Sequence, residues 1–276
     1  MAAKDADAVA RYVRHHAEQA LLGLAAFSYE AGDALHREMT VEAVHGARTS
    51  LRRLRATLHS FPGSFTDPAA TDADLRAVAR SLSAVRDIDV IGAHLREELE
   101  ALPPELVLGP VGDDLGEALA ARRRAAVEIV DRERTGKAWG RAVKQLGAWQ
   151  RTPPRLAEKD PLLVLKQIRE EVLAQVRESE GYPTALHSAR KAAKRWRYAA
   201  ELLVPDLPKA GKHFDRATQF HVLLGEMQDA VVTAQFLLEH ARLGNRSGHN
   251  GFTTGVLYER ARQRRDRTVD QALRLA

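Results

Sequence analysis

The 276-residue sequence contains no cysteine, so disulfide bonds and thiolate metal sites are excluded. Aromatic residues make up only 5% of the chain, which leaves little material for strands or for base-stacking surfaces. No apolar run approaches the roughly 18 residues that a membrane-spanning helix needs, and the polar N-terminus lacks a secretory hydrophobic region. These absences predict a cytoplasmic protein without a membrane segment.

The residues that are abundant favour helix. Ala, Leu, Arg and Glu dominate, hydrophobic residues reach 45%, and charged residues reach 29%. Apolar residues recur with helical spacing between clusters of Pro and Gly, and no strand-like alternation stands out. The pattern predicts an all-α chain with helices at about 5–30, 41–60, 72–100, 113–148 (with a break near Gly136), 161–179, 184–204, 209–241 and 253–274.

A basic segment occurs twice, at 44–58 and at 186–200. His45 matches His187 at an offset of 142 residues, and residues 82–87 align with 224–229 at the same offset. Because several successive helices keep this register, we interpret the chain as a duplication with its boundary near 153–160. Two pseudo-symmetric four-helix units follow from this interpretation.

The charge of the chain is concentrated in those two segments. The net charge is +5, yet four arginines and no acid lie between His45 and Leu58, and five cations and no acid lie between His187 and Tyr198. Such blocks within a roughly balanced chain point to a polyanionic ligand.

On a helix, each basic segment presents an apolar stripe beside a cationic one. The cationic positions of each copy fall within an arc of about 80°, and their lack of acids four residues away predicts that they have no carboxylate partners. An anion that bridges them would relieve their mutual repulsion, and arginine suits phosphate because its planar fork donates two hydrogen bonds. The cationic stripes consist of His45, Arg48, Arg52 and Arg55, and of His187, Arg190, Lys194 and Arg197.

The two basic segments and two later elements resemble the CHAD family, the conserved histidine α-helical domain. The segments read HGARTSLRRLR from His45 and HSARKAAKRWRY from His187. The element RDIDV at 86–90 is similar to the family's Arg-Asp-Leu-Asp-Val, and LGEMQDA at 224–230 is similar to its Leu-Gly-Glu/Asp-Leu-Asn-Asp-Ala, with Gln228 where Asn is common. The resemblance covers residues 8–275, as a stand-alone domain with halves at about 8–152 and 160–275.

The resemblance implies an all-helical fold whose two halves pack around a basic central channel that binds inorganic polyphosphate. It also implies an association with polyphosphate granules. Because no cofactor motif and no metal spacing occurs in the sequence, neither a cofactor nor a bound metal is expected. The eight residues of the cationic stripes are the implied phosphate ligands. The secondary candidates are Arg53, Lys191, Arg195, Tyr198, Arg122, Arg123, Arg264 and Arg265. Tyr198 is open to two interpretations, as a hydroxyl donor to phosphate or as a packing residue.

Asp87 and Asp229 are interpreted as structural residues that pair with arginines of the basic helices, because nothing else in the sequence assembles a metal site. The stripe of Trp139, Leu146 and Trp149 is predicted to be core.

The main prediction is a polyphosphate-binding protein that is not an enzyme. The alternative is a metal-dependent phosphohydrolase or phosphotransferase acting on polyphosphate or a nucleotide, with His45, His187, Asp87 and Asp89 as candidates. Nucleic acid is not the expected ligand, since neither stacking aromatics nor a recognition motif occurs. A helical scaffold for an acidic protein surface also stays open.

Overall fold

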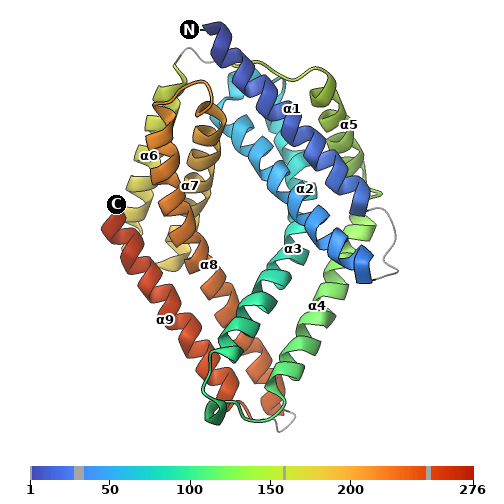
Figure 1. The fold of residues 1–276 in the computed structure, drawn as a ribbon, viewed down its shortest axis with the longest axis vertical. Helices are drawn as coiled ribbons and strands as arrows, with labels where there is room; N and C mark the ends of the chain where they lie inside the picture. Colours follow the sequence, from blue (N-terminus) through green and yellow to red (C-terminus); the bar gives the residue numbers. More distant parts are fainter. Residues whose placement is uncertain (1, 28–33, 158–159, 247–249) are drawn as a thin grey trace. The chain divides into compact units, whose positions relative to one another are not determined.

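The computed structural model describes residues 2–27, 34–157, 160–246 and 250–276, and these ranges are almost entirely helical (Figure 1). They contain no β-strand, which confirms the all-α prediction for the described part of the chain. The helices are α1 (Ala2–Phe27), α2 (Ala34–Ser60), α3 (Pro68–Glu100), α4 (Val111–Glu133), α5 (Lys137–Arg151), α6 (Pro161–Glu178), α7 (Pro183–Leu203), α8 (Ala210–Arg246) and α9 (Phe252–Leu275), with short 3₁₀ helices at Pro62–Ser64 and Pro104–Leu106.

The predicted helices correspond to these elements, with differences at their ends. The break expected near Gly136 is present, because α4 ends at Glu133 and α5 begins at Lys137. α2 begins at Ala34, earlier than predicted, and α8 continues to Arg246. Residues 28–30 of the first predicted helix, and residues 158–159 of the expected boundary, lie outside the described residues.

Proline marks the first residue of α3, α6 and α7, where its missing N–H costs no helical hydrogen bond. Aspartates precede two of these prolines as caps. Oδ1 of Asp67 accepts a hydrogen bond from the backbone N–H of Ala70 at 3.2 Å, and Oδ1 of Asp160 accepts one from Leu163 at 3.2 Å. These three prolines therefore mark helix starts.

The chain forms two compact units, and each contains segments from distant parts of the sequence. Unit 1 comprises Met1–Arg86, Glu128–Glu171 and Ala192–Thr218, and unit 2 comprises Asp87–Val127, Val172–Lys191 and Gln219–Ala276. Five helices, namely α3, α4, α6, α7 and α8, contain a boundary between the units. The division into two sequence repeats is a separate matter and stays a prediction.

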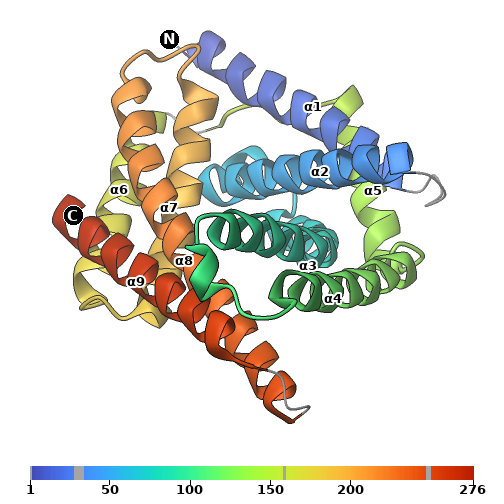
Figure 2. The same ribbon diagram turned by 60° about the horizontal axis from the view of Figure 1, so that its bottom comes forward.

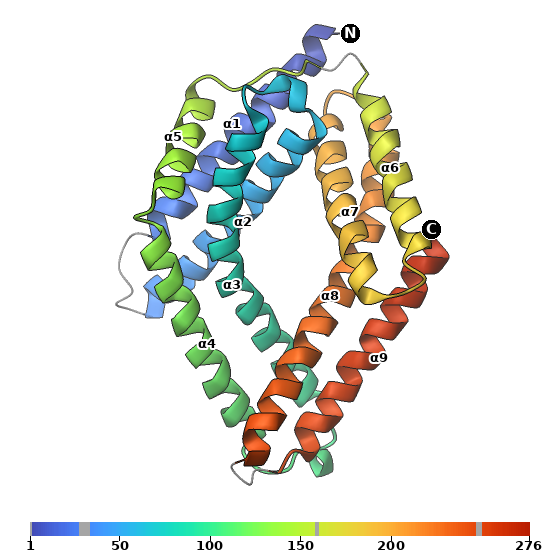
Figure 3. The same ribbon diagram turned by 180° about the vertical axis from the view of Figure 1, so that it is seen from behind.

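In unit 1, α1 lies along α2 and α5 (Figure 3). The crossing of α1 and α2 is close at Gly23, where a Cβ atom would lie 2.6 Å from the carbonyl oxygen of Ala43. Only glycine fits such an approach, so Gly23 lets α2 press its apolar face onto α1. The buried side chains of α5 include Trp139, Leu146 and Trp149, which confirms that this stripe is core.

In unit 2, α8 and α9 run side by side (Figure 2). Their shared core also takes in the second part of α3 and the start of α4. The hydroxyl of Thr253 on α9 donates to the carbonyl of Leu106 at 2.7 Å and accepts from the N–H of Leu108 at 2.9 Å, which fixes the turn after α3. The core consists of Ile91, Leu95, Leu102, Val111, Leu115, Phe236, Leu237 and Leu257.

Within the described ranges, no helix combines the length and the apolar character that crossing a bilayer requires.

Candidate functional site

The apolar stripes predicted on the two basic segments are buried, and this burial orients the cations beside them. On α2, Ala47, Leu51 and Leu54 are fully buried and Leu58 is nearly so; Phe61, one residue beyond the helix, is also fully buried. On α7, Ala189, Ala193, Trp196 and Ala200 are fully buried. The neighbouring cations Arg48, Arg52, Arg190 and Lys194 are half-buried, so their charged ends lie beside the core and still reach solvent.

His45 lies in a strongly positive environment within unit 1. Its side chain is exposed, yet partial burial and the charges of Arg86, Arg48, Arg52 and Arg53 lower its pKa. All of the charged groups that cause this shift are cations. The electrostatic potential around His45 is therefore positive. Its sources are the arginines of α2 and Arg86 of α3, the last residue of α3 that belongs to unit 1.

Arg48 and Arg52 differ in how the protein holds them. Nε of Arg48 donates to the hydroxyl of Ser83 on α3 at 2.9 Å, and Ser83 in turn donates to the carbonyl of Ala79 at 2.7 Å. Nε of Arg52 is buried and has no hydrogen-bond partner among the described residues. A buried donor without a partner is costly. An anion that accepts a hydrogen bond from Nε of Arg52 would remove this cost.

Glu201 joins the two basic helices within unit 1. Its carboxylate accepts a hydrogen bond from Nε of Arg53 on α2 at 2.7 Å and another from the hydroxyl of Tyr12 on α1 at 3.0 Å. It also lies 3.6 Å from the guanidinium of Arg197, one helical turn earlier on α7. Burial and the charge of Glu201 raise the pKa of Tyr12, so the tyrosine stays a hydrogen-bond donor.

Tyr198 packs at the same place. Its side chain is 3% exposed, and the guanidinium groups of Arg53 and Arg197 each lie 5.2 Å from the centre of its ring. At this distance cation–π attraction holds both arginines. These are packing contacts, and a hydrogen bond from the hydroxyl of Tyr198 to phosphate stays a prediction.

Arg55 belongs to a second carboxylate centre. Asp72, whose side chain is 5% exposed, accepts hydrogen bonds from Arg55 at 2.7 Å and from Arg76 at 2.5 Å, and it lies 3.2 Å from His59. Although burial alone would raise it, the hydrogen bonds from His59, Arg55 and Arg76 hold the pKa of Asp72 well below its usual value.

The prediction that the cationic stripes lack carboxylate partners is therefore wrong for two of their members. Arg55 pairs with Asp72, which lies 17 residues along the chain and on another helix. Arg197 pairs with Glu201, four residues further along α7. Glu201 directly follows the basic segment 186–200, so this spacing can be read from the sequence.

The part of α7 that belongs to unit 1 carries further cations. Arg195 donates to the carboxylate of Glu171 on α6 through a short ion pair. Lys194 is half-buried one residue earlier. Nε1 of Trp196 donates to Nδ1 of His213 on α8 at 3.2 Å, which fixes this turn of α7 against α8.

The start of α7 lies in unit 2 and contains His187, Arg190 and Lys191. Nδ1 of His187 lies 3.1 Å from Oε1 of Gln228 on α8, and the ring nitrogen donates, because an amide oxygen can only accept. The orientation of His187 is thus set by Gln228, the residue that departs from the family pattern. Lys191 is exposed.

The four arginines that are secondary candidates on α4 and α9 each pair with a carboxylate within the described residues. Arg122 pairs with Glu239 at 2.8 Å, and Arg123 pairs with Asp89 at 3.0 Å. Arg264 pairs with Glu98 at 2.8 Å, and Arg265 pairs with its neighbour Asp266 at 2.7 Å. These contacts give each arginine a structural partner.

The two aspartates interpreted as partners of the basic helices have different surroundings. Asp87 is exposed on α3, and Asp229 lines a pocket of unit 2. Asp89, which the enzymatic alternative uses, is bonded to Arg123. Across the described ranges, no three His, Asp or Glu side chains come together in a way that could hold a metal ion.

Several residues of the site were missed from sequence. Glu201 was marked only by its i+4 spacing from Arg197, and Arg86 only by its place in the RDIDV element. Tyr12 and Asp72 come from segments without a basic motif, so no sequence signal connects them to the site.

The family of the chain follows from a match to the CHAD domain, which covers residues 18–238. The chain therefore belongs to the CHAD domain family, and the resemblance inferred from the basic segments is confirmed.

Two similar curated proteins come from Mycobacterium tuberculosis: the uncharacterized protein MT2285 of strain CDC 1551 and the uncharacterized protein Rv2226 of strain H37Rv. Each is 29% identical over 294 aligned residues, covering 98% of this chain and 55% of the relative. The chain thus spans about half the length of the curated relatives that it matches.

Two solved structures share the fold. PptA from Streptomyces chartreusis superposes with a TM-score of 0.77 at 19% identity and covers 98% of both chains. The CHAD domain from the plant Ricinus communis superposes with a TM-score of 0.67 at 22% identity, covering 97% of this chain and 90% of that one. At these identities the likeness concerns the fold.

Proposed function

We propose that this CHAD protein binds inorganic polyphosphate and does not act on it chemically. The observation that carries the proposal is the environment of His45, an exposed histidine whose pKa is lowered by burial and by four arginines from two helices. Such a group of cations is repulsive by itself and becomes favourable when an anion lies among them. Membership of the CHAD family supports the same ligand, since the family is associated with polyphosphate.

An extended polyanion suits the arrangement better than a compact one. His45, Arg48 and Arg52 occupy successive turns of α2, so their charges extend over about 10 Å along the helix. Each guanidinium can donate two parallel hydrogen bonds to phosphate oxygens. A phosphate chain offers such oxygens at every unit along its length.

Glu201 prepares the site without neutralising it. It lies between Arg53 on α2 and Arg197 on α7, two cations against one carboxylate. Nε of Arg197 is buried without a hydrogen-bond partner among the described residues, so part of its donor capacity stays available. The carboxylate thus holds the side chains in one geometry and leaves a positive excess for phosphate.

In our proposal, the basic segment of α7 also binds phosphate. His187 is oriented by Gln228, and Arg190 and Lys194 occupy the positions that correspond to Arg48 and Arg52. The proposal has three further parts. The two halves of the chain pack around a basic channel, the protein is cytoplasmic, and it associates with polyphosphate granules.

The test is calorimetry with long-chain polyphosphate on the wild type and on the double variant Arg48→Glu, Arg190→Glu. We expect the wild type to bind more tightly as the phosphate chain lengthens and more weakly as salt rises. The double variant should lose binding. On addition of polyphosphate, NMR titration should show the pKa of His45 rising, because phosphate charge favours the protonated ring.

The control is Arg134→Glu with Arg274→Glu, which makes the same change in net charge at two exposed positions, one just after α4 and one on α9. Circular dichroism should show both double variants folded. Unchanged polyphosphate binding in the first pair, or an equal loss in both pairs, contradicts the proposal. Release of phosphate in the presence of Mg²⁺ would favour the enzymatic alternative, and equal affinity for RNA would favour a nucleic-acid ligand.

A further inference from the structure

Thr49 lies among the cationic positions of α2 and has no role in the proposed function. Its neighbours on the helix are His45, four residues before it, and Arg52 and Arg53, three and four residues after it. Residues at these spacings share one face of a helix, with Cβ atoms about 5–6 Å apart. A ligand that contacts both His45 and Arg52 therefore also lies beside Thr49.

The hydroxyl of Thr49 is not satisfied by the protein. Its oxygen is buried and has no hydrogen-bond partner among the described residues. Most buried hydroxyls are paired, because an unpaired one has given up its hydrogen bonds to water without replacement. A ligand that accepts a hydrogen bond from Thr49 would supply the missing partner.

Other helical threonines of the chain are satisfied by their own helix. Thr57, two turns later on α2, donates its hydroxyl to the carbonyl of Arg53 at 3.0 Å, and Thr218 makes the same kind of bond on α8. This bond to the carbonyl four residues earlier is the usual one for threonine inside a helix. A carbonyl stands at that spacing from Thr49 too, yet the hydroxyl does not use it.

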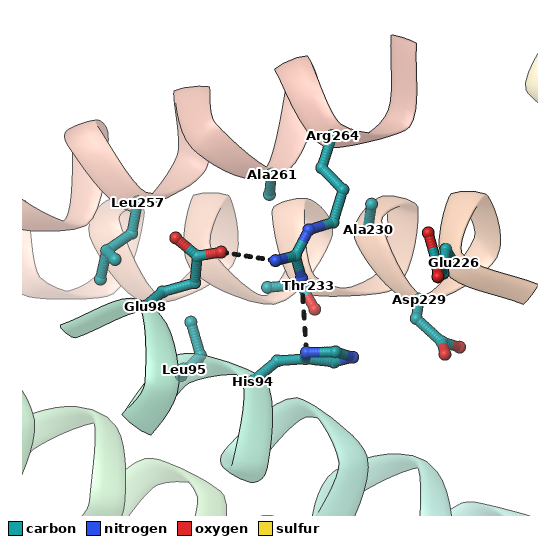
Figure 4. Close-up of a pocket in the computed structure, with 10 residues that line it drawn as sticks. All are labelled: His94, Leu95, Glu98, Glu226, Asp229, Ala230, Thr233, Leu257, Ala261 and Arg264. Carbon is teal, nitrogen blue, oxygen red and sulfur yellow. Dashed lines mark hydrogen bonds and ion pairs between the residues drawn. The ribbon is translucent and has the colours of Figure 1, made fainter. Parts of the chain in front are cut away.

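A second unsatisfied donor lies one turn further along α2. Nε of Arg52 is buried and also lacks a partner among the described residues. Arg264 of unit 2 gives the contrast, because it donates to Glu98 at 2.8 Å and lies 3.4 Å from Nδ1 of His94 (Figure 4). Protein groups satisfy that arginine, whereas the two donors on α2 suit a ligand with two acceptor atoms.

Gly46 leaves space for a ligand next to Thr49. It lies three residues earlier on α2, and a Cβ atom there would meet no atom beyond the adjacent helix backbone within 4 Å. Because helical side chains lean toward the N-terminus of their helix, the side chain of Thr49 is directed toward this turn. Thr49 as a whole is half-buried, so a rotation about its Cα–Cβ bond brings the hydroxyl to a ligand.

The second basic segment has a donor at the corresponding position. At the offset of 142 residues Thr49 matches Lys191, which is exposed. A hydroxyl and an ammonium group differ in charge, but both donate hydrogen bonds. The two copies therefore share a donor at this position, although they do not share a charge.

We propose that Thr49 is a further phosphate-binding residue. Its hydroxyl donates to one oxygen of a phosphate unit, and Nε of Arg52 donates to another. The inference rests on the proposed polyphosphate binding and adds a neutral donor to the cations of α2. Because a neutral donor releases no counterion when it binds phosphate, its contribution to affinity does not depend on salt.

Calorimetry of the full chain with long-chain polyphosphate at several salt concentrations tests the proposal. Thr49→Val replaces the hydroxyl by a methyl group and should weaken binding about fivefold, which corresponds to about 1 kcal/mol. The slope of log affinity against log salt should stay that of the wild type. Arg48→Gln should lower both the affinity and the slope, because one cation fewer displaces counterions.

Thr57→Val is the matched control, since it makes the same change on the same helix at a hydroxyl that is bonded internally. It should retain the wild-type affinity, and Thr49→Ser, which keeps the hydroxyl, should retain most of it. The melting temperature of Thr49→Val should be no lower than that of the wild type, because the removed hydroxyl makes no bond in the unliganded protein.

Three results would overturn the inference while polyphosphate binding itself stands. They are wild-type affinity in Thr49→Val, equal weakening in Thr49→Val and Thr57→Val, and a lower melting temperature of Thr49→Val, which would assign the hydroxyl to the fold. Absence of polyphosphate binding in the wild type is a different result, because it overturns the proposed function together with this inference.

Discussion

The basic segment of α2 and its counterpart in α7 repeat the same five positions, and the two copies differ mainly in the carboxylates that hold them. Arg53 pairs with Glu201, and both side chains are mostly buried, at 20% and 23% exposure. The equivalent Arg195 pairs with Glu171, which is 40% exposed. An ion pair contributes more, and costs more to break, as it is withdrawn from solvent.

The difference shows that equivalent cations of the two basic segments have different surroundings. Glu201 lies on α7 and holds Arg53 of the first copy, Tyr12 of α1 and Arg197 of the second copy, so one carboxylate connects three helices of unit 1. In the second copy Arg195 pairs with Glu171 on α6, whose side chain is 40% exposed. We infer that the pair of Arg53 with Glu201 stabilises the fold, and that the more exposed pair of Arg195 with Glu171 holds its side chains less firmly.

The largest effect is expected from Glu201→Gln. The change leaves Arg53 without its charged partner in a mostly buried place, so the free energy of unfolding should fall by about 3 kcal/mol. Urea denaturation measures the fall. Glu178→Gln, at an exposed position of α6, is the matched control and should change stability little. If the free energy of unfolding falls as little as in Glu178→Gln, the buried pair of Arg53 with Glu201 is no more stabilising than an exposed carboxylate, and the two copies do not differ in this respect.

A second effect concerns acid stability around Arg53. Burial and the charges of Arg53 and His15 lower the pKa of His16 from 6.5 to about 3. Between these two pH values His16 is protonated in the unfolded chain and neutral in the folded state. The stability that this histidine provides is present above pH 6.5 and is lost as pH falls toward 3. Between pH 6.5 and 4.5 the loss should be about 2 kcal/mol.

His16→Phe should flatten that pH dependence, as urea titrations at several pH values would show. Nδ1 of His16 has no hydrogen-bond partner among the described residues, so phenylalanine forfeits no bond there. The window lies above the range in which Asp72 and Asp74 titrate, because the pKa of each is lowered from 3.8. An unchanged slope in the variant would place the acid sensitivity elsewhere.

Within the first copy, ligand binding should separate Arg52 from Arg55. Arg52→Gln should weaken polyphosphate binding about fivefold, which is about 1 kcal/mol, because its Nε has no internal partner. Arg55→Gln should affect binding less and stability more, since Arg55 is bonded to Asp72. Paired calorimetry and denaturation of both variants measure this, and the reverse ranking would contradict it.

The smallest effect is expected from Glu171→Gln in the second copy. Its pair with Arg195 is more exposed than that of Glu201, so the loss of stability should stay below about 1 kcal/mol. Denaturation under the conditions used for Glu201→Gln gives the comparison directly. Equal losses from both glutamates would show that burial does not distinguish the copies.

Periodicity was enough to predict the helices and their buried faces, because residues such as Leu51 and Trp196 recur at the spacing of one helical face. The break at Gly136 was visible for the same reason. The partners of the cations were not, since Tyr12, Asp72 and Glu171 lie far from the basic segments in the sequence and on other helices. Charge patterning identifies cations, but only packing decides which of them meet a carboxylate.

The way the chain threads through its two units has a consequence for synthesis. Unit 1 needs residues as late as Thr218, and unit 2 needs segments from Asp87 to Ala276. A chain that emerges from the ribosome N-terminus first therefore cannot close either unit until more than three-quarters of it has been made. Until then unit 1 lacks the parts of α7 and α8 that complete it, so slow elongation in the middle of the message should favour aggregation or chaperone capture.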